Sequence, residues 1–523
     1  MVEEKKSSAA KDLGIRAAKG TLIYTIGNVI GSLAVLLLLI ILARLLNPPD
    51  FGLYAIAIAF YNILSGHFVF GTVMRKDIPQ TKDTHKIAEL ISNGYAVALI
   101  ISIAVALVAF LCSNYIAIAI YHNASLSGSL QLASLLVFLY ALFNLTLAIL
   151  VAIDKVKEGT LIYLLYAFIQ LITSVGLVLA GYGIFGALVG LGIGLIIPSI
   201  IGLILIARHI RSEFVKPTKG IAKHLINFSV PVLVSNLATY VPPNLAILLL
   251  GVYSSSLIVG NYNAAFRFGN FVSVILVSIS FVLLPAFAKA FSEKDLHSKI
   301  GKIYNSSIYY SLLLLLPVVI YVVSVSRPLL YLLFSSQYSL APFYFIVIVL
   351  GSMVGIISTY AGNLIVGYGD TKRFMYYQLL AVVIQIALLF ALTPLFGANG
   401  VLIALFVISQ ILMDLIFVYA LRKQFSFSQQ FSNLIKLVIP SLLLMVLLYY
   451  VTIFLHYSRW SLVTNFVGTI ILFPPLVALF GGIRKDTLKF IKEIADNLRI
   501  GAVAAYFIKY TELFMRAEKE TKQ

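Results

Sequence analysis

Charged residues are scarce in this chain, and cysteine is nearly absent. Asp, Glu, Lys and Arg make up 11% of the 523 residues, whereas soluble domains carry about 25%. Because 61% of the residues are hydrophobic, the composition excludes an ordinary soluble domain and indicates a polytopic helical membrane protein. The one cysteine, Cys112, excludes an intramolecular disulfide, a thiolate metal cluster and a redox-active thiol pair.

Enzyme signatures are also missing. The sequence has no glycine-rich phosphate loop followed by lysine, and its seven histidines show no pair at the spacing of metal ligands on a helix. We therefore expect no enzyme, no catalytic residues, no metal and no cofactor, with coupling to H⁺ or Na⁺ left open. The chemistry that remains is binding and movement.

The net charge of +18 has a topological explanation. Of the 38 Lys and Arg residues, 34 lie in the two tails or in the even-numbered connections between apolar spans. Such a bias marks the cytoplasmic side of a membrane protein. It predicts cytoplasmic N- and C-termini in a cell (plasma) membrane, with lipids as neighbours and no nucleic-acid partner.

Apolar segments predict an all-α protein with about fourteen transmembrane helices. We expect a cytoplasmic N-tail, an N-lobe of six spans, a cytoplasmic linker, a C-lobe of six spans, two additional spans, and a basic tail with an amphipathic helix over residues 486–501. The corresponding ranges are 1–20, 21–207, 208–224, 225–420, 421–482 and 483–523.

An internal repeat supports the two lobes. A shift of 208 residues places Asn28 on Asn236, Gly52 on Gly260 and Asn62 on Asn270, without a gap. A shift of 214 places Gly183 and Gly186 on Gly397 and Gly400, in turns between paired helices. Because the first shift spans six helices, the copies have the same orientation, and we expect pseudo-symmetric lobes around a central cavity.

The segment 257–285 carries the deepest charge of the chain. Arg267 lies about ten residues into this apolar span, where an arginine costs about 2.5–3.5 kcal/mol on insertion scales. Either it contacts an anionic substrate group, such as a phosphate, or it pairs with a carbonyl or amide to hold the lobe together. Asn263 lies one helical turn away and is the amide most suited to a cavity; Asn261 and Asn270 lie on the same helix.

Four further positions have two interpretations each. Arg44 faces a cavity mouth or extends to the headgroups, and Arg75 receives an anionic headgroup or is an ordinary cytoplasmic flank. Asn28 and Asn236 bind sugar hydroxyls or join helices, and their repeat relation favours packing.

Prolines and one acid complete the candidates. Pro231, Pro242 and Pro243 interrupt the seventh span and act as hinges or as static kinks. Asp414 is the one carboxylate well inside a span and is a candidate for ion coupling.

The ordered segments ILARLLNPPDFGLYAIAIAF, NFSVPVLVSNLATYVPPN, SSSLIVGNYNAAFRFGNF and GNLIVGYGDTKRFMYYQLLAVVIQ resemble the polysaccharide-biosynthesis (oligosaccharide) flippases of the multidrug/oligosaccharidyl-lipid/polysaccharide (MOP) exporter superfamily. The resemblance covers nearly the whole chain. It implies a cavity walled by helices one, two, seven and eight, with Arg267, Arg44 and Arg75 as its cationic residues.

The resemblance also implies a substrate: an oligosaccharide linked through phosphate or pyrophosphate to a polyprenyl carrier, moved from the cytoplasmic to the outer leaflet. We expect the protein to act as a monomer. The chain departs from the lipid II flippase branch, since spans one and two hold almost no charge away from their ends. It also lacks the early acidic residue of many drug antiporters. The alternative is an exporter of cationic amphiphiles coupled to H⁺ or Na⁺.

Overall fold

The chain forms two compact helical units. The computed structural model describes residues 2–66, 68–81, 83–210, 215–272, 300–425, 431–483, 487–489, 492, 496 and 501–515. The first unit comprises Met1–Asn263 with Ile386–Val401, and the second comprises Ala264–Gln385 with Leu402–Gln523. The described residues contain helices and short connections and no strand, so the all-α class is confirmed.

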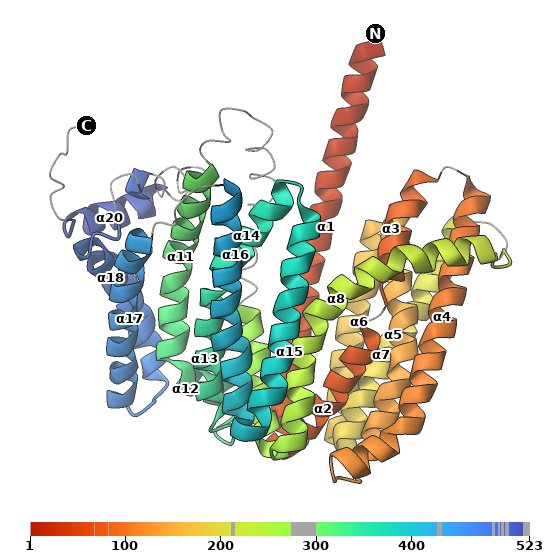
Figure 1. Ribbon diagram of the computed structural model, residues 1–523, viewed down its shortest axis with the longest axis horizontal. Helices are drawn as coiled ribbons and strands as arrows, with labels where there is room; N and C mark the ends of the chain where they lie inside the picture. Colours follow the sequence, from red (N-terminus) through yellow and green to blue (C-terminus); the bar gives the residue numbers. More distant parts are fainter. Residues whose placement is uncertain are drawn as a thin grey trace. The chain divides into compact units, whose positions relative to one another are not determined.

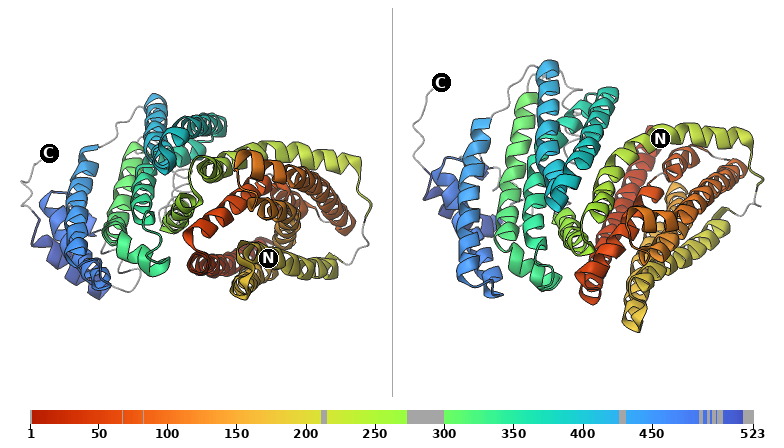
Figure 2. Two further views of the ribbon diagram at one scale, coloured as in Figure 1. Left: turned by 90° about the horizontal axis from the view of Figure 1, so that it is seen from below. Right: turned by 60° about the horizontal axis from the view of Figure 1, so that its bottom comes forward.

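The first unit is a bundle of long helices. Helices α4 to α7 run side by side, α1 packs on α6, and α8 crosses α2, α3 and α4 (Figures 1 and 2). Its elements are α1 (Val2–Leu45), α2 (Pro48–Ser65), α3 (Phe70–Gln80), α4 (Thr84–Tyr115), η1 (Ile116–Ile120), α5 (Leu126–Ala152), α6 (Val156–Leu177), η2 (Val178–Tyr182), α7 (Gly183–Ile210) and α8 (Lys219–Tyr253).

Small residues allow the helices of the first unit to approach closely. A Cβ on Gly190 would lie 2.4 Å from the backbone of Ser174, and a Cβ on Gly194 would lie 2.8 Å from the Cβ of Gln170. In hydrocarbon, helices gain little from burying apolar surface, so close packing of small residues becomes the main source of association. The α6–α7 pair is therefore specified by glycines one turn apart.

The second unit has its own core. Helices α11, α17 and α18 pack together, and α14 packs on α16. Its elements are α11 (Ile300–Ser324), α12 (Ser326–Leu333), α13 (Ala341–Val354), α14 (Ile356–Gly367), η3 (Ile403–Ile408), α16 (Ser409–Phe425), α17 (Phe431–Phe454), α18 (Trp460–Leu479) and α20 (Gly501–Glu512). Helix α15 (Thr371–Leu402) contributes its first part to this unit and its later part to the first.

A buried amide joins α18 to α17 inside this core. Asn465 donates hydrogen bonds to the carbonyl of Leu448 at 2.9 Å and to the hydroxyl of Thr452 at 2.6 Å. Without water, such polar groups must find protein partners. The last described helix, α20, packs on α18, and the Tyr510 hydroxyl donates to the carbonyl of Ile471. Most of the amphipathic helix expected over 486–501 lies outside the described residues.

The membrane character of the chain is confirmed, and the count of fourteen spans is approximate. In the described part of the chain, nine helical stretches are long and apolar enough to cross a bilayer, or ten if the bent pair α2–α3 is one span. Two of them, Val156–Ile210 with 55 residues and Thr371–Lys423 with 53, are each long enough for two spans. The bent pair, Pro48–Ser65 and Phe70–Gln80, turns by 41° between α2 and α3.

The repeat is visible in the backbone. Gly183 has φ 51° and ψ −134°, and Gly397 has φ 54° and ψ −129°. These angles are open to glycine and strained for other residues. Both glycines lie in the turns where the sequence places them, so the two copies use the same reversal.

A second repeat pair meets face to face in the first unit. A Cβ on Gly52 would lie 1.9 Å from the carbonyl oxygen of Ser256, and a Cβ on Gly260 would lie 2.0 Å from the carbonyl oxygen of Pro48. The same shift of 208 relates Gly52 to Gly260 and Pro48 to Ser256. Exchanging the two copies of the repeat therefore converts the Gly52–Ser256 contact into the Gly260–Pro48 contact, as two-fold symmetry requires.

The units and the expected lobes are different divisions. The first unit extends to Asn263, beyond the linker expected at 208–224, because α8 packs on α2, α3 and α4. The lobes were inferred from the sequence repeat, whereas the units are defined by contacts between residues. The lobe boundaries therefore stay a prediction. Helix α8 is continuous through positions 231, 242 and 243, so the hinge role of its prolines is likewise a prediction.

Candidate substrate-binding site

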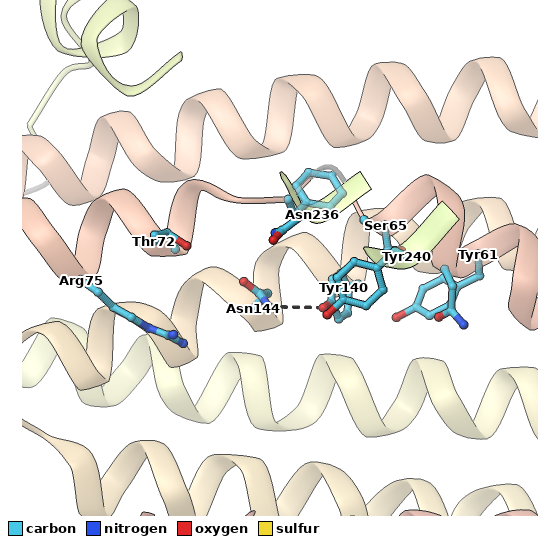
Figure 3. A pocket seen from close by; sticks show the side chains of 12 residues that line it. Tyr61, Ser65, Thr72, Arg75, Tyr140, Asn144, Asn236 and Tyr240 are labelled. Atoms are coloured by element: carbon cyan, nitrogen blue, oxygen red, sulfur yellow. Dashed lines mark hydrogen bonds between the residues drawn. The ribbon is translucent and has the colours of Figure 1, made fainter. Parts of the chain in front are cut away.

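A polar cavity lies within the first unit (Figure 3). Its volume is about 190 Å³. Its wall is formed by the end of α2, the start of α3, the middle of α5, part of α8, and the short connection between α2 and α3. The lining residues are Tyr61, Asn62, Ser65, Gly66, Phe68, Gly71, Thr72, Arg75, Tyr140, Asn144, Asn236 and Tyr240. We call it the Arg75 cavity.

Local sequence explains why these side chains converge. Helix α2 ends at Ser65, and α3 starts again at Phe70 after a bend. Helix α3 then approaches α5 so closely that a Cβ on Gly71 would lie 2.8 Å from the Cβ of Ala148. Arg75 follows Gly71 by one turn, so it lies on the same face of α3. Figure 3 shows its side chain extending toward Asn144.

Amides and phenols form the interior of the cavity. The Asn144 amide donates to the Tyr140 hydroxyl at 3.3 Å, and the Tyr61 ring meets the Tyr140 ring edge-on at 5.9 Å between centroids. On the other side, the Asn62 amide donates to the side-chain oxygen of Asn244 at 3.1 Å. Asn62 therefore joins α2 to α8 while it lines the wall, so the packing role and the cavity role coincide.

The cavity carries positive charge. Arg75 is its one cationic lining residue, and none of the twelve lining residues is acidic. The next residues of α3 have other partners: Lys76 lies 4.0 Å from the centroid of the Phe228 ring, and Asp77 pairs with His224 at 3.0 Å. Arg75 itself is exposed and lines the cavity, where the five N–H donors of its guanidinium suit a phosphate.

Two of the predicted site residues, Arg75 and Asn236, meet in this cavity. Asn28 is half-buried on α1, and Arg44 is exposed in the last turn of that helix. Neither belongs to the lining residues. Arg75 therefore lines a cavity as well as flanking a span, and its role in substrate binding stays a prediction.

The remaining predicted residues lie on the helix over 256–272. Asn261 and Asn263 are buried, and the Asn261 amide donates to the carbonyl of Leu257 at 2.9 Å. Arg267 is half-buried, and Asn270 is exposed. The boundary between the units falls after Asn263, so Arg267 belongs to the second unit, and its role in a cavity stays a prediction.

Asp414 has a structural partner in the second unit. Its carboxylate accepts a hydrogen bond from the backbone N–H of Ser358 at 2.9 Å. Ser358 lies in the first turn of α14, which begins where the span Ala341–Gly367 is broken at Gly355. A carboxylate at a helix N-terminus satisfies a free donor and interacts favourably with the helix dipole. Ion coupling through Asp414 stays a prediction.

Sequence reasoning missed several cavity residues. Tyr61, Tyr140, Asn144 and Tyr240 line the wall, yet none was a candidate. Tyr140 and Asn144 lie one turn apart within a predicted span, and such a polar pair in an apolar helix is the signal that points to them.

Comparison with known protein families shows the family to which the chain belongs. The family model of polysaccharide biosynthesis proteins matches residues 41–341, more than half of the sequence. The chain belongs to the polysaccharide biosynthesis protein family. The resemblance inferred from the sequence is thereby confirmed. A second family model, that of the lipid II flippase MurJ, matches residues 252–473 of this polysaccharide biosynthesis protein.

Solved structures show the same fold. The lipid II flippase MurJ in an inward closed conformation has a TM-score of 0.71 at 14% identity, covering 88% of this chain and 98% of its own. An inward-facing multidrug resistance MATE family transporter of the MOP superfamily has a TM-score of 0.65 at 14% identity, with coverages of 76% and 94%.

A MOP superfamily transporter from Pyrococcus furiosus has a TM-score of 0.52 at 15% identity, with coverages of 79% and 95%. Comparison with curated proteins found no match. This polysaccharide biosynthesis protein therefore has the fold of MOP-superfamily transporters and is a multi-pass membrane protein.

Proposed function

We propose that this protein is a flippase that moves a lipid-linked oligosaccharide from the cytoplasmic to the outer leaflet for the assembly of a surface polysaccharide or glycoprotein. The Arg75 cavity is the observation that carries the proposal. It joins one guanidinium to a set of amides and phenols and has no acidic lining residue. The family match and the MurJ model agree with a lipid-linked substrate.

Each part of such a substrate has a physical partner. The guanidinium of Arg75 binds a phosphate or pyrophosphate oxygen through charge-assisted hydrogen bonds. Amide and phenol groups, such as those of Asn144 and Tyr240, exchange hydrogen bonds with sugar hydroxyls. The polyprenyl chain stays in the bilayer, so only the polar headgroup enters the protein.

Movement of the headgroup requires alternating access. Two repeats with the same orientation rock against each other about an axis along the membrane normal, as in other transporters built from repeats. We place the protein in the plasma membrane with both termini in the cytoplasm, following the distribution of basic residues, and we expect the monomer to be active.

An exporter of cationic amphiphiles is the weaker candidate. It would need a carboxylate in its binding cavity, and the lining residues of the Arg75 cavity include none. Asp414 accepts a hydrogen bond from the Ser358 backbone, so this acid already has a structural task. Coupling to H⁺ or Na⁺ remains open as an energy source for either substrate.

A reconstituted flipping assay tests the proposal. Purified protein is placed in liposomes with a fluorescent polyprenyl-pyrophosphate oligosaccharide, and cleavage by an external glycosidase reports the headgroups that have crossed. We expect Arg75→Gln to slow flipping about tenfold or more, since hydrogen bonds to charged groups contribute about 1.5–3 kcal/mol. Arg267→Ala tests the second predicted cation in the same assay.

Lys219→Gln is the matched control, because Lys219 is basic, exposed and not a lining residue of the cavity. This variant should retain the parent rate. Equal rates for Arg75→Gln and the parent would refute the assigned role of the cavity. A parent protein that moves cationic dyes and not the oligosaccharide would favour the exporter.

A further inference from the structure

A second cavity lies at one end of the first unit and shares no lining residue with the Arg75 cavity. It is formed where α4 begins, where α5 ends before α6, and where α7 ends, and Figure 1 shows these ends at the same end of the unit. Its volume is about 450 Å³. The lining residues are Thr84, Ile87, Ile153, Lys155, Arg208, His209 and Ile210. We call it the basic pocket.

Its lining combines basic and apolar side chains. Lys155 and Arg208 are basic, three of the seven residues are isoleucines, and none of the seven is acidic. Among the neighbouring acids, Glu158 pairs with His209, with 3.0 Å between Oε1 and Nε2, while Asp154 and Asp83 are exposed next to the lining residues Lys155 and Thr84. Since no acidic side chain is among the lining residues, Lys155 and Arg208 give the pocket itself a positive character that attracts an anion.

The position of Arg208 at the end of α7 indicates the kind of anion that the pocket binds. Ile200 and Ile204 precede it on α7 at intervals of four residues, and their side chains are 49% and 48% exposed. Residues four apart share one face of a helix, so Arg208 ends a stripe of exposed isoleucines. In a membrane protein such a stripe contacts acyl chains, and a basic residue at its end lies at the level of the headgroups.

We propose that the basic pocket binds the phosphate of an anionic phospholipid, with an acyl chain along the Ile200–Ile204 stripe. Basic pockets between helices at the cytoplasmic end are suited to such headgroups. Arg208 and Lys155 contact the phosphate from α7 and from the α5–α6 connection, and the hydroxyl of Thr84 supplies a further hydrogen bond. A bound lipid would join three elements at one end of the bundle.

Native mass spectrometry of the full-length protein tests this inference. Protein in mild detergent is incubated with phosphatidylglycerol or with zwitterionic phosphatidylcholine, and bound lipids are counted. We expect preferential retention of phosphatidylglycerol, lowered about fivefold by Lys155→Gln or Arg208→Gln and more in the double variant. Arg208→Lys and Lys219→Gln are the controls, and both should retain the lipid.

Two further arms separate the possible sources of the phosphate. Glycerol 3-phosphate in solution should not displace the lipid, and Ile204→Asn should weaken lipid retention with the charges intact. Equal retention by the parent and the double variant, with both folded by circular dichroism, would overturn the proposal; so would full displacement by glycerol 3-phosphate. The assay contains no oligosaccharide, and Arg75→Gln should retain the lipid, so its outcome is independent of flipping.

Discussion

Replacing Gly52 with alanine should push two helices apart. The new Cβ would lie 1.9 Å from the carbonyl oxygen of Ser256 and 2.9 Å from the amide nitrogen of Gly260. Both are backbone atoms, so no side-chain rotation relieves the clash. The start of helix 256–272 must move away from α2 by roughly 1–2 Å to restore an ordinary contact of about 3.5 Å.

The expected cost follows from two opposing effects. Overpacking destabilises a fold by about 1–3 kcal/mol, and replacing a helical glycine with alanine stabilises the helix by about 0.5–1 kcal/mol. We therefore expect Gly52→Ala to lower the free energy of unfolding by about 1–2 kcal/mol. Gly176→Ala is the matched control, because that helical position is exposed and a Cβ there meets nothing within 4 Å; it should be neutral or stabilising.

Denaturation of the purified protein in detergent measures the effect, and a double-mutant cycle tests its origin. Gly260→Ala should cost about as much as Gly52→Ala, since the two contacts are related by the repeat. The double variant should cost less than the sum, because one displacement of the helices relieves both clashes. Parent-like stability of Gly52→Ala, or strict additivity in the cycle, would refute the reasoning.

Three further outcomes follow from the structure. Asp414→Ala should lower stability by about 1–3 kcal/mol because it leaves the buried N–H of Ser358 unpaired, whereas Asp414→Asn keeps an acceptor and should cost much less in the same denaturation experiment. Gly183→Ala should lower the melting temperature, since the backbone at φ 51° strains any other residue by about 1–3 kcal/mol; an unchanged melting temperature would contradict the assigned conformation. Tyr457→Leu removes the ring that lies 4.3 Å from the Arg327 guanidinium and should cost about 0.5–1 kcal/mol, while Arg327→Ala in the Tyr457→Leu background should add less than it does alone.

Much of the fold could be predicted from the sequence. The bilayer acts on each span separately, so the apolar segments show the helices and the basic connections predict their orientation. The turn at Gly183 recurs at Gly397, as the repeat predicts, because a reversal of this geometry depends on one local residue. The bend between α2 and α3 was not predicted, since hydropathy averages over a turn or two.

The site depended on tertiary structure. In the sequence, Arg75 looks like an ordinary basic flank of a span, and the cavity beside it forms only because α3 packs against α5 at Gly71. Asn144 and Tyr240, which also line this cavity, lie 69 and 165 residues further along the chain. In the sequence, Asp414 is an isolated acid, and only the fold brings it to the backbone N–H of Ser358 in the first turn of α14. Local apolarity determines which segments enter the membrane. Which polar side chains then share one cavity is decided by contacts between distant helices, and those contacts follow from packing that no single segment encodes.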